Sequence, residues 1–122
     1  MRYARTLGAV VFAAAATVLA TSPAHAASYT AHPHYMNRGS AVFNSSTNTL
    51  KVCDNAADGL TVMVTIEDDN NFFGYEMTKG TGQCQTYKPK LRNGQRFTLQ
   101  AFNGKKGKAV SGSHGALVYG IV

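Results

Sequence analysis

The chain has 122 residues, and twelve Lys and Arg residues against six Asp and Glu residues give it a net charge of +6. This length supports one domain with one small core and excludes an assembly of several domains. The excess of positive charge is typical of proteins that meet an anionic partner, or of a solvated surface that keeps the chain soluble.

The first 26 residues have the pattern of a signal peptide. Arg2 and Arg5 precede an uncharged apolar run from Leu7 to Ala20, and Ala24-His25-Ala26 forms an Ala-x-Ala cleavage pattern. The run is too short and too rich in Ala for a good membrane span, so we expect an exported, extracellular protein without a membrane anchor. Cleavage after Ala26 leaves 96 residues, and the loss of both arginines lowers the net charge from +6 to +4.

The remaining chain divides into an arm and a domain. Residues 27–38 contain Pro33 and show no hydrophobic period, so we expect a flexible or loosely docked arm, followed by a folded domain over 39–122. The strongest strand signal lies at residues 60–68, where Leu60, Val62, Val64 and Ile66 occupy every second position. Further strands are predicted at 40–44, 49–54, 72–78, 83–88, 96–102 and 116–121.

These strands predict an all-β fold. Turn signals such as Asn93-Gly94 recur about every eight to twelve residues, which favours a Greek-key β-sandwich of about seven antiparallel strands. A small closed β-barrel is the alternative that the pattern leaves open. Cys53 and Cys84 are the only cysteines, and in an exported chain we expect them to form one disulfide between neighbouring or facing strands.

Charge is distributed unevenly along the chain. All six acidic residues lie between Asp54 and Glu76, whereas eight basic residues and no acidic residue follow Met77. We therefore expect one acidic and one basic region on the folded domain. Lys105, Lys106 and Lys108 form a basic loop and are the candidate anion-binding residues, with a solvated face as the alternative. The expected anion is a polymer, and no nucleic acid is expected as a partner.

Three patterns are candidates for catalytic or metal sites. His32-Pro33-His34 offers two imidazoles on an arm, which is a poor metal site without a third ligand. Glu67–Asn71 crowds carboxylates without the ligand spacing of a calcium loop, so a turn is favoured and weak calcium binding by Asp68 and Asp69 stays open. Ser113 and His114 lie in a Gly-rich turn rather than a nucleophile elbow. We therefore assign no catalytic residue, no metal site and no cofactor.

The aromatic segment Phe72-Phe73-Gly74-Tyr75 is the candidate partner-binding element, with Phe72, Phe73 and Tyr75 as its residues. Adjacent residues of a strand point to opposite faces, so one of the two phenylalanines should be exposed. An exposed ring at a domain edge can anchor a partner. The alternative is a strand covered on both faces.

The run Leu50-x-Val52-Cys53-Asp54, continued by Asp58-Gly59 and Val62-x-Val64 and then by Cys84, resembles a group of small secreted actinobacterial single-disulfide β proteins. A weaker likeness, in Thr61–Val64 and in the closing Gly112-Ser113-His114-Gly115, is to the tendamistat-type α-amylase inhibitors. The latter likeness implies a β-sandwich. That family inhibits through a Trp-Arg-Tyr triplet and has two disulfides, whereas this chain has no Trp and two cysteines, so no inhibitory residue is carried over.

The resulting functional expectation is a secreted, non-catalytic, monomeric protein that binds an extracellular protein or polysaccharide through its loops. Two alternatives remain. One is an inhibitor of an extracellular hydrolase that inserts the loop Asn70–Tyr75 into the enzyme. The other is a basic antimicrobial or cell-wall-binding protein.

Overall fold

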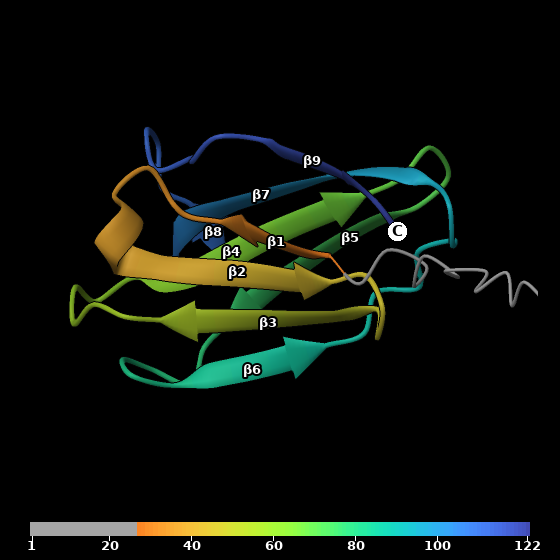
Figure 1. The fold of residues 1–122 in the computed structure, drawn as a ribbon. Helices are drawn as coiled ribbons and strands as arrows, with labels where there is room; N and C mark the ends of the chain where they lie inside the picture. Colours follow the sequence, from red (N-terminus) through yellow and green to blue (C-terminus); the bar gives the residue numbers. More distant parts are fainter. Residues whose placement is uncertain (1–26) are drawn as a thin grey trace, which may run out of the picture.

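The computed structural model describes residues 27–122, which form two antiparallel β-sheets packed face to face (Figure 1). The expected signal peptide, residues 1–26, lies outside the described residues. The first sheet has the order β1-β2-β3-β6, with strands Ser28–Ala31, Gly39–Asn44, Thr49–Asp54 and Cys84–Tyr87. The second has the order β5-β4-β7, with strands Phe72–Met77, Thr61–Glu67 and Arg96–Lys105, and both β8 (Lys108–Ala109) and β9 (Val118–Ile121) pair with β7. Within this part of the chain, no helix is long and apolar enough to cross a membrane.

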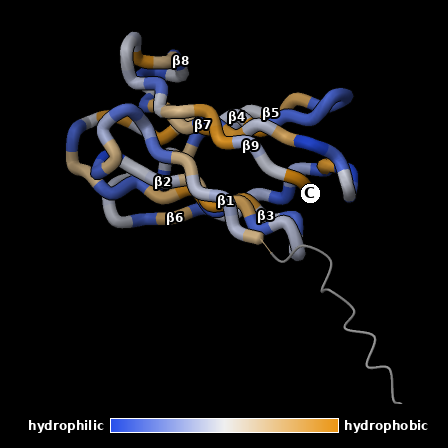
Figure 2. Tube along the Cα trace, turned by 45° about the horizontal axis from the view of Figure 1, so that its top comes forward, coloured by the Kyte–Doolittle hydropathy of each residue, from blue (hydrophilic) through white to orange (hydrophobic). Residues whose placement is uncertain are grey.

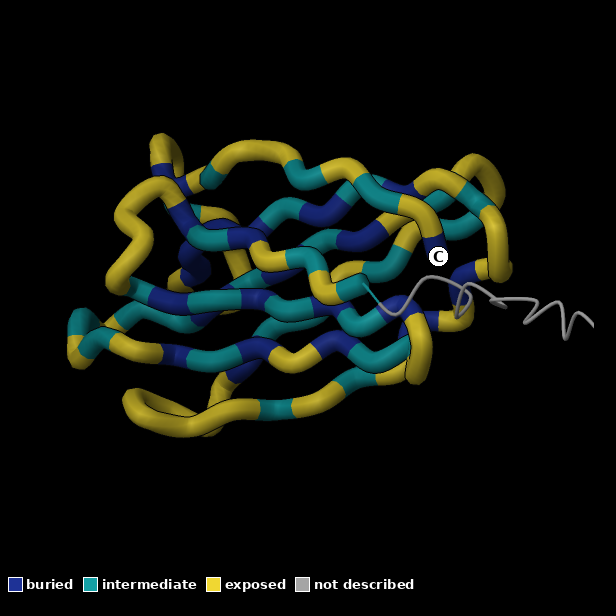
Figure 3. The backbone as a smooth tube through the Cα atoms, viewed as in Figure 1, coloured by how far each residue is buried: buried dark blue, intermediate teal, exposed yellow. Residues whose placement is uncertain are grey.

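The core lies between the two sheets because each strand turns alternate side chains inward. In β4, Val62, Val64 and Ile66 are buried, and the residues between them are not (Figure 3). Phe43 of the first sheet meets Phe97 of the second edge to face, with ring centroids 4.9 Å apart. Each such fully buried side chain stabilises the fold by about 1.5–3 kcal/mol relative to an exposed one.

The predicted all-β, two-sheet fold is confirmed. The chain crosses between the sheets at three connections, β3 to β4, β5 to β6 and β6 to β7, as expected for a Greek-key sandwich. All seven predicted strands are present with bounds shifted by at most a few residues. The strand predicted at 96–102 continues to Lys105 because its end forms a hairpin with β8, which the sequence analysis missed.

The prediction of a flexible arm at residues 27–38 is wrong for its first part. Ser28–Ala31 forms β1, which pairs with β2 from Ser28↔Asn44 to Ala31↔Ala41. Ala31 and Pro33 are buried, and the short 3-10 helix η1, Met36–Arg38, leads into β2. The physical reason is that β1 covers the edge of β2, whose backbone groups would otherwise lack partners. The folded domain therefore includes this segment.

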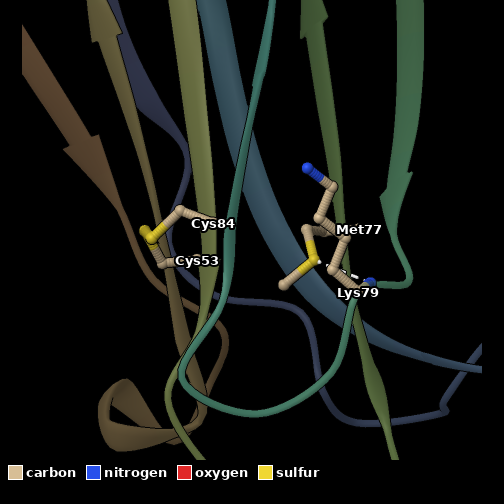
Figure 4. Close-up of a disulfide and its surroundings, with 4 residues drawn as sticks. All are labelled: Cys53, Met77, Lys79 and Cys84. Atoms are coloured by element: carbon tan, nitrogen blue, oxygen red, sulfur yellow. Dashed lines mark hydrogen bonds between the residues drawn. A yellow bond between two sulfur atoms is a disulfide. The ribbon is translucent and has the colours of Figure 1, made fainter.

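The predicted disulfide between Cys53 and Cys84 is confirmed, and it joins neighbouring strands rather than facing sheets (Figure 4). Cys53 of β3 is the register partner of Cys84 of β6. Both side chains lie on the outer face of the first sheet, because Val52 and Asp54 on either side of Cys53 are buried.

Candidate functional site

The outer face of the second sheet has the most exposed aromatic side chains among residues 27–122. Tyr119 on β9 is 69 % exposed and Phe72 on β5 is 65 % exposed. Strand register places them in one line, since Phe72 is opposite Glu67, Glu67 is opposite Thr98, and Thr98 is opposite Tyr119. These four residues are called the cross-strand row below. With adjacent strands about 4.8 Å apart, its two ends are about 14 Å apart.

An open groove of about 760 Å³ runs beside the row at the Tyr119 end. Its walls include Glu67, Asp69 and Arg96, and they also include Tyr29, Thr98 and Tyr119. Polar and aromatic groups therefore line one hollow, to which the first sheet contributes Tyr29 and the second sheet with its β4–β5 turn contributes the other residues. A concave site with a few convergent polar groups is the usual form of a ligand-binding site.

The floor of the groove depends on Gly120. Tyr29 packs edge to face on Phe97 with ring centroids 5.0 Å apart, and its hydroxyl lies 3.4 Å from both the backbone oxygen and the backbone nitrogen of Ile121. A Cβ atom on Gly120 would lie 2.5 Å from a Tyr29 ring carbon and 2.6 Å from a Phe97 ring carbon. Glycine at this position therefore lets both rings pack against the backbone of β9. This packing fixes the position of the strand that carries Tyr119.

The turn between β4 and β5 is fixed by Asp68. Its Oδ1 accepts hydrogen bonds from the backbone N–H groups of Asn70 at 2.9 Å and Asn71 at 2.7 Å, and Oδ2 accepts a longer one, 3.4 Å, from Arg92. These bonds, the one from Asn70 first, lower the pKa of Asp68 below its usual value. The carboxylate thus holds the turn that delivers Phe72 to the outer face.

The structure separates the three predicted partner-binding residues. Phe72 is exposed on the outer face, whereas Phe73 and Tyr75 point inward and pack against the core. Phe73 stacks on Tyr75 with ring centroids 6.4 Å apart, and Tyr75 stacks on Tyr87 at 4.3 Å. The prediction that Phe72 and Phe73 face opposite sides is confirmed, and only Phe72 belongs to the candidate site.

The three candidate anion-binding lysines lie together on the β7–β8 hairpin, which projects from the body of the domain (Figure 2). Lys105 and Lys108 are register partners, and the two-residue turn between them has positive φ at both Lys106 (53°) and Gly107 (76°). Such turns match the twist of the flanking strands. All three lysines are exposed.

The expected separation of acidic and basic regions is incomplete. Arg38 Nε lies 3.7 Å from Asp58 Oδ2, and Arg96 lines the same groove as Glu67 and Asp69. The reason is antiparallel pairing, because β7 runs back along β4 and places its basic start beside the acidic end of β4. Arg38 and Arg96 therefore lie among acidic residues, although the lysines of the hairpin stay apart from them.

The other patterns considered from the sequence are occupied by structural contacts. The Ser113 hydroxyl is buried and lies 2.6 Å from the Val110 carbonyl oxygen, while the His114 ring stacks on Phe102 at 4.5 Å. His32 Nδ1 lies 3.0 Å from the Gly39 carbonyl oxygen. Over residues 27–122, no group of three or more His, Cys, Asp or Glu side chains is placed to hold a metal ion.

Sequence reasoning missed Tyr119, Tyr29 and Arg96 as members of the site. The segment Val118-Tyr119-Gly120-Ile121 carried no signal for an outward Tyr119, because apolar residues occupy both alternating faces and only the structure shows Gly120 on the inward one. The pairing of Thr98 with Tyr119 brings together segments about twenty residues apart, and no local pattern reports that register.

No family model matches the sequence, and neither the curated proteins nor the solved structures include a significant match.

Proposed function

We propose that this protein is a secreted, non-catalytic binding module that holds an extracellular partner on the outer face of its second sheet. The observation that carries the proposal is that Phe72 and Tyr119, the two most exposed aromatic side chains among residues 27–122, end one cross-strand row beside an open groove. Secretion is supported by the signal-peptide pattern and by the disulfide, which is typical of oxidising compartments.

The energetic basis is the burial of two rings under a ligand. Covering a large aromatic side chain removes apolar surface from water and is worth about 1.5–3 kcal/mol for each ring. Both rings are carried by strands of one sheet, so little conformational entropy is lost when they bind. Aromatic anchors of this kind carry most of the binding free energy in many interfaces.

A panel of immobilised extracellular proteins and polysaccharides tests this proposal. Wild-type protein and a Leu117→Ala control, which removes an exposed apolar side chain outside the groove, should be retained by at least one member of the panel. The double variant Phe72→Ala, Tyr119→Ala should be retained at least tenfold less by that member, with an unchanged circular dichroism spectrum. Equal retention of all three proteins by every binding member, or retention of none, would contradict the proposal.

A second candidate function is favoured by the projecting β7–β8 hairpin. Its three exposed lysines form a compact cationic tip, which suits attachment to an anionic polymer such as those of a cell wall. This function uses a different part of β7 from the groove, so the two can be tested separately.

A further inference from the structure

The groove carries an excess of negative charge on a protein that is otherwise positively charged. Glu67, Asp68 and Asp69 line it together with a single guanidinium, that of Arg96. The Asp68 carboxylate is engaged by backbone N–H groups of its own turn, whereas Glu67 and Asp69 are exposed. Glu67 accepts a 3.3 Å hydrogen bond from the Thr98 hydroxyl and has further lone pairs for a ligand. By charge complementarity, the occupant carries positive charge.

The two rings set the shape of that occupant. Tyr119 lines the groove and Phe72 lies beyond its lining, at the other end of the cross-strand row, about 14 Å away, a distance that a short extended oligosaccharide spans. An aromatic face packs on the C–H face of a pyranose ring and also attracts a cation. Between the rings, the Glu67 carboxylate and the Thr98 hydroxyl oxygen offer acceptor lone pairs to hydroxyl or ammonium groups. The row therefore has one stacking position at each end and two polar positions between them.

We propose that the ligand of this groove is a linear polysaccharide of amino sugars with protonated amino groups, such as a chain of glucosamine units. The inference rests on the binding function proposed above. One sugar stacks on Phe72, another stacks on Tyr119, and the ammonium groups lie against Glu67 and Asp69. A neutral glycan would leave the carboxylates without charged partners, and an acidic glycan would be repelled by them.

A basic peptide satisfies the charge of the groove but finds no free strand edge at the middle of the row. Extended peptides bind sheets through the free backbone groups of an edge strand. Here β4 is paired on both sides, with β5 and β7, and β7 is paired with β4 on one side and with β8 and β9 on the other. The middle of the row thus offers side chains alone, which favours a ligand that binds by stacking and by its own hydroxyl and amino groups.

Calorimetric titration with three probes of matched length tests the ligand class. The probes are fully deacetylated glucosamine trimer, its N-acetylated counterpart and a tri-lysine peptide, each at pH 6 and low salt. The glucosamine trimer should bind, and the other two should bind at least tenfold more weakly. Equal binding of the acetylated trimer would show that charge plays no part, and equal binding of tri-lysine would identify a basic peptide as the occupant. Either result overturns the inference.

Variants locate the binding. Glu67→Gln combined with Asp69→Asn should weaken binding of the glucosamine trimer at least tenfold and reduce its salt dependence. Asp58→Asn removes a carboxylate at the opposite end of β4 and should leave affinity unchanged. Phe72→Ala with Tyr119→Ala should abolish binding, whereas Leu117→Ala should not. Equal affinity in all these variants would place the trimer elsewhere and would overturn the proposed site.

The two sets of experiments distinguish failure of the amino-sugar inference from failure of the proposed binding function. If the glucosamine trimer does not bind, but a member of the extracellular panel still requires Phe72 and Tyr119 for retention, the amino-sugar inference fails and the binding module stands. If neither the trimer nor any panel member depends on these two rings, both proposals fail.

Discussion

Cys53 of β3 lies directly opposite Cys84 of β6, with 4.1 Å between the two Cα atoms, and the disulfide joins their side chains. Among the described residues, β6 pairs with β3 alone, so the bond fastens an edge strand to the sheet. It also closes a loop that contains all of β4 and β5. In the unfolded chain, the cross-link therefore restrains the segments that form two of the five strands of the second sheet.

Replacing both cysteines with serine should lower the free energy of unfolding by about 3.5–4 kcal/mol in the chain-entropy model, given a sequence separation of 31 residues. Urea unfolding followed by circular dichroism measures the change. The native protein should also resist thiol labelling and weigh two hydrogens less than its reduced form. A loss of less than about 1 kcal/mol would show that the unfolded chain is restrained in another way.

The neighbouring phenylalanines should respond differently to truncation. Phe72→Ala should change the free energy of unfolding by no more than about 0.5 kcal/mol, because the ring is exposed. Phe73→Ala should cost about 2–3 kcal/mol, less than a fully buried phenylalanine, because its ring is partly buried against the core. Urea unfolding of both variants checks this. Equal, large losses would mean that Phe72 also belongs to the core and has no part in binding.

Asp54 and Asp68 should shift stability with pH in opposite directions. Burial, the larger cause, raises the pKa of Asp54 above 3.8, although the backbone N–H of Ala56 acts against it. The folded state therefore holds this proton more tightly than the unfolded state, and ionisation destabilises the protein as pH rises above 3.8. Asp54→Asn keeps the acceptor for Ala56, so it should be more stable than wild type at pH 7, with the difference shrinking towards pH 3.

Asp68 serves as the comparison for Asp54, because its pKa is shifted in the opposite direction. Its pKa is lower in the folded state than the unfolded pKa of 3.8. The Asp68 carboxylate therefore contributes to folding stability above pH 3.8, and this contribution is lost as pH falls through the folded pKa. Asp68→Asn should therefore be less stable than wild type at pH 7, and its deficit should disappear in strong acid. Denaturant unfolding of both variants at several pH values checks the signs. Parallel pH profiles for the two variants would contradict this account of the two carboxyl groups.

Gly120→Ala should destabilise the protein by about 1–3 kcal/mol, because the new methyl group overlaps two packed rings. The overlap involves ring carbons of Tyr29 and Phe97. In a Tyr29→Ala background the same substitution should cost less, since one of the rings is gone. A double-mutant cycle by thermal unfolding measures the difference. An equal cost in both backgrounds would mean that Tyr29 does not set the position of β9.

The fold was largely readable from the sequence, because period-two alternation depends on burial of one face. The alternation of Val62, Val64 and Ile66 predicts a strand even when its neighbouring strands in the sheet are not known. The exposure of Phe72 followed from the same rule. In contrast, β1 is four residues long and ends close to Pro33, so its pairing with β2 had no local signal strong enough to predict it.

The site was less readable, because it depends on register between distant strands. Nothing near Thr98 in the sequence indicates that Tyr119 stands opposite it, or that Arg96 shares a groove with Glu67. The lysines of the hairpin, three within four residues, needed no such register. A cluster of residues that are adjacent in the sequence can be recognised from the sequence alone. A row across several strands can be recognised only when the pairing of those strands is known.

The hairpin prediction separates the basic tip from the groove. Lys105→Gln, Lys106→Gln and Lys108→Gln together remove three positive charges from a turn whose conformation is set by Gly107, so the fold should be retained. Retention of wild type on a heparin column should fall steeply with salt, because exposed charges are screened. The triple variant should elute at clearly lower salt, since the removed charges are adjacent and act on the same stretch of polymer.

A control with the same change of net charge distinguishes a local tip from overall charge. Lys79, Lys88 and Lys90 are exposed and lie outside the hairpin, so their replacement by glutamine lowers the net charge equally. If the tip binds the polymer, this control should elute between wild type and the hairpin variant, and the Phe72→Ala, Tyr119→Ala variant should elute with wild type. Identical elution of the hairpin variant and the lysine control would mean that net charge alone drives retention, and the hairpin would then be a solvated turn.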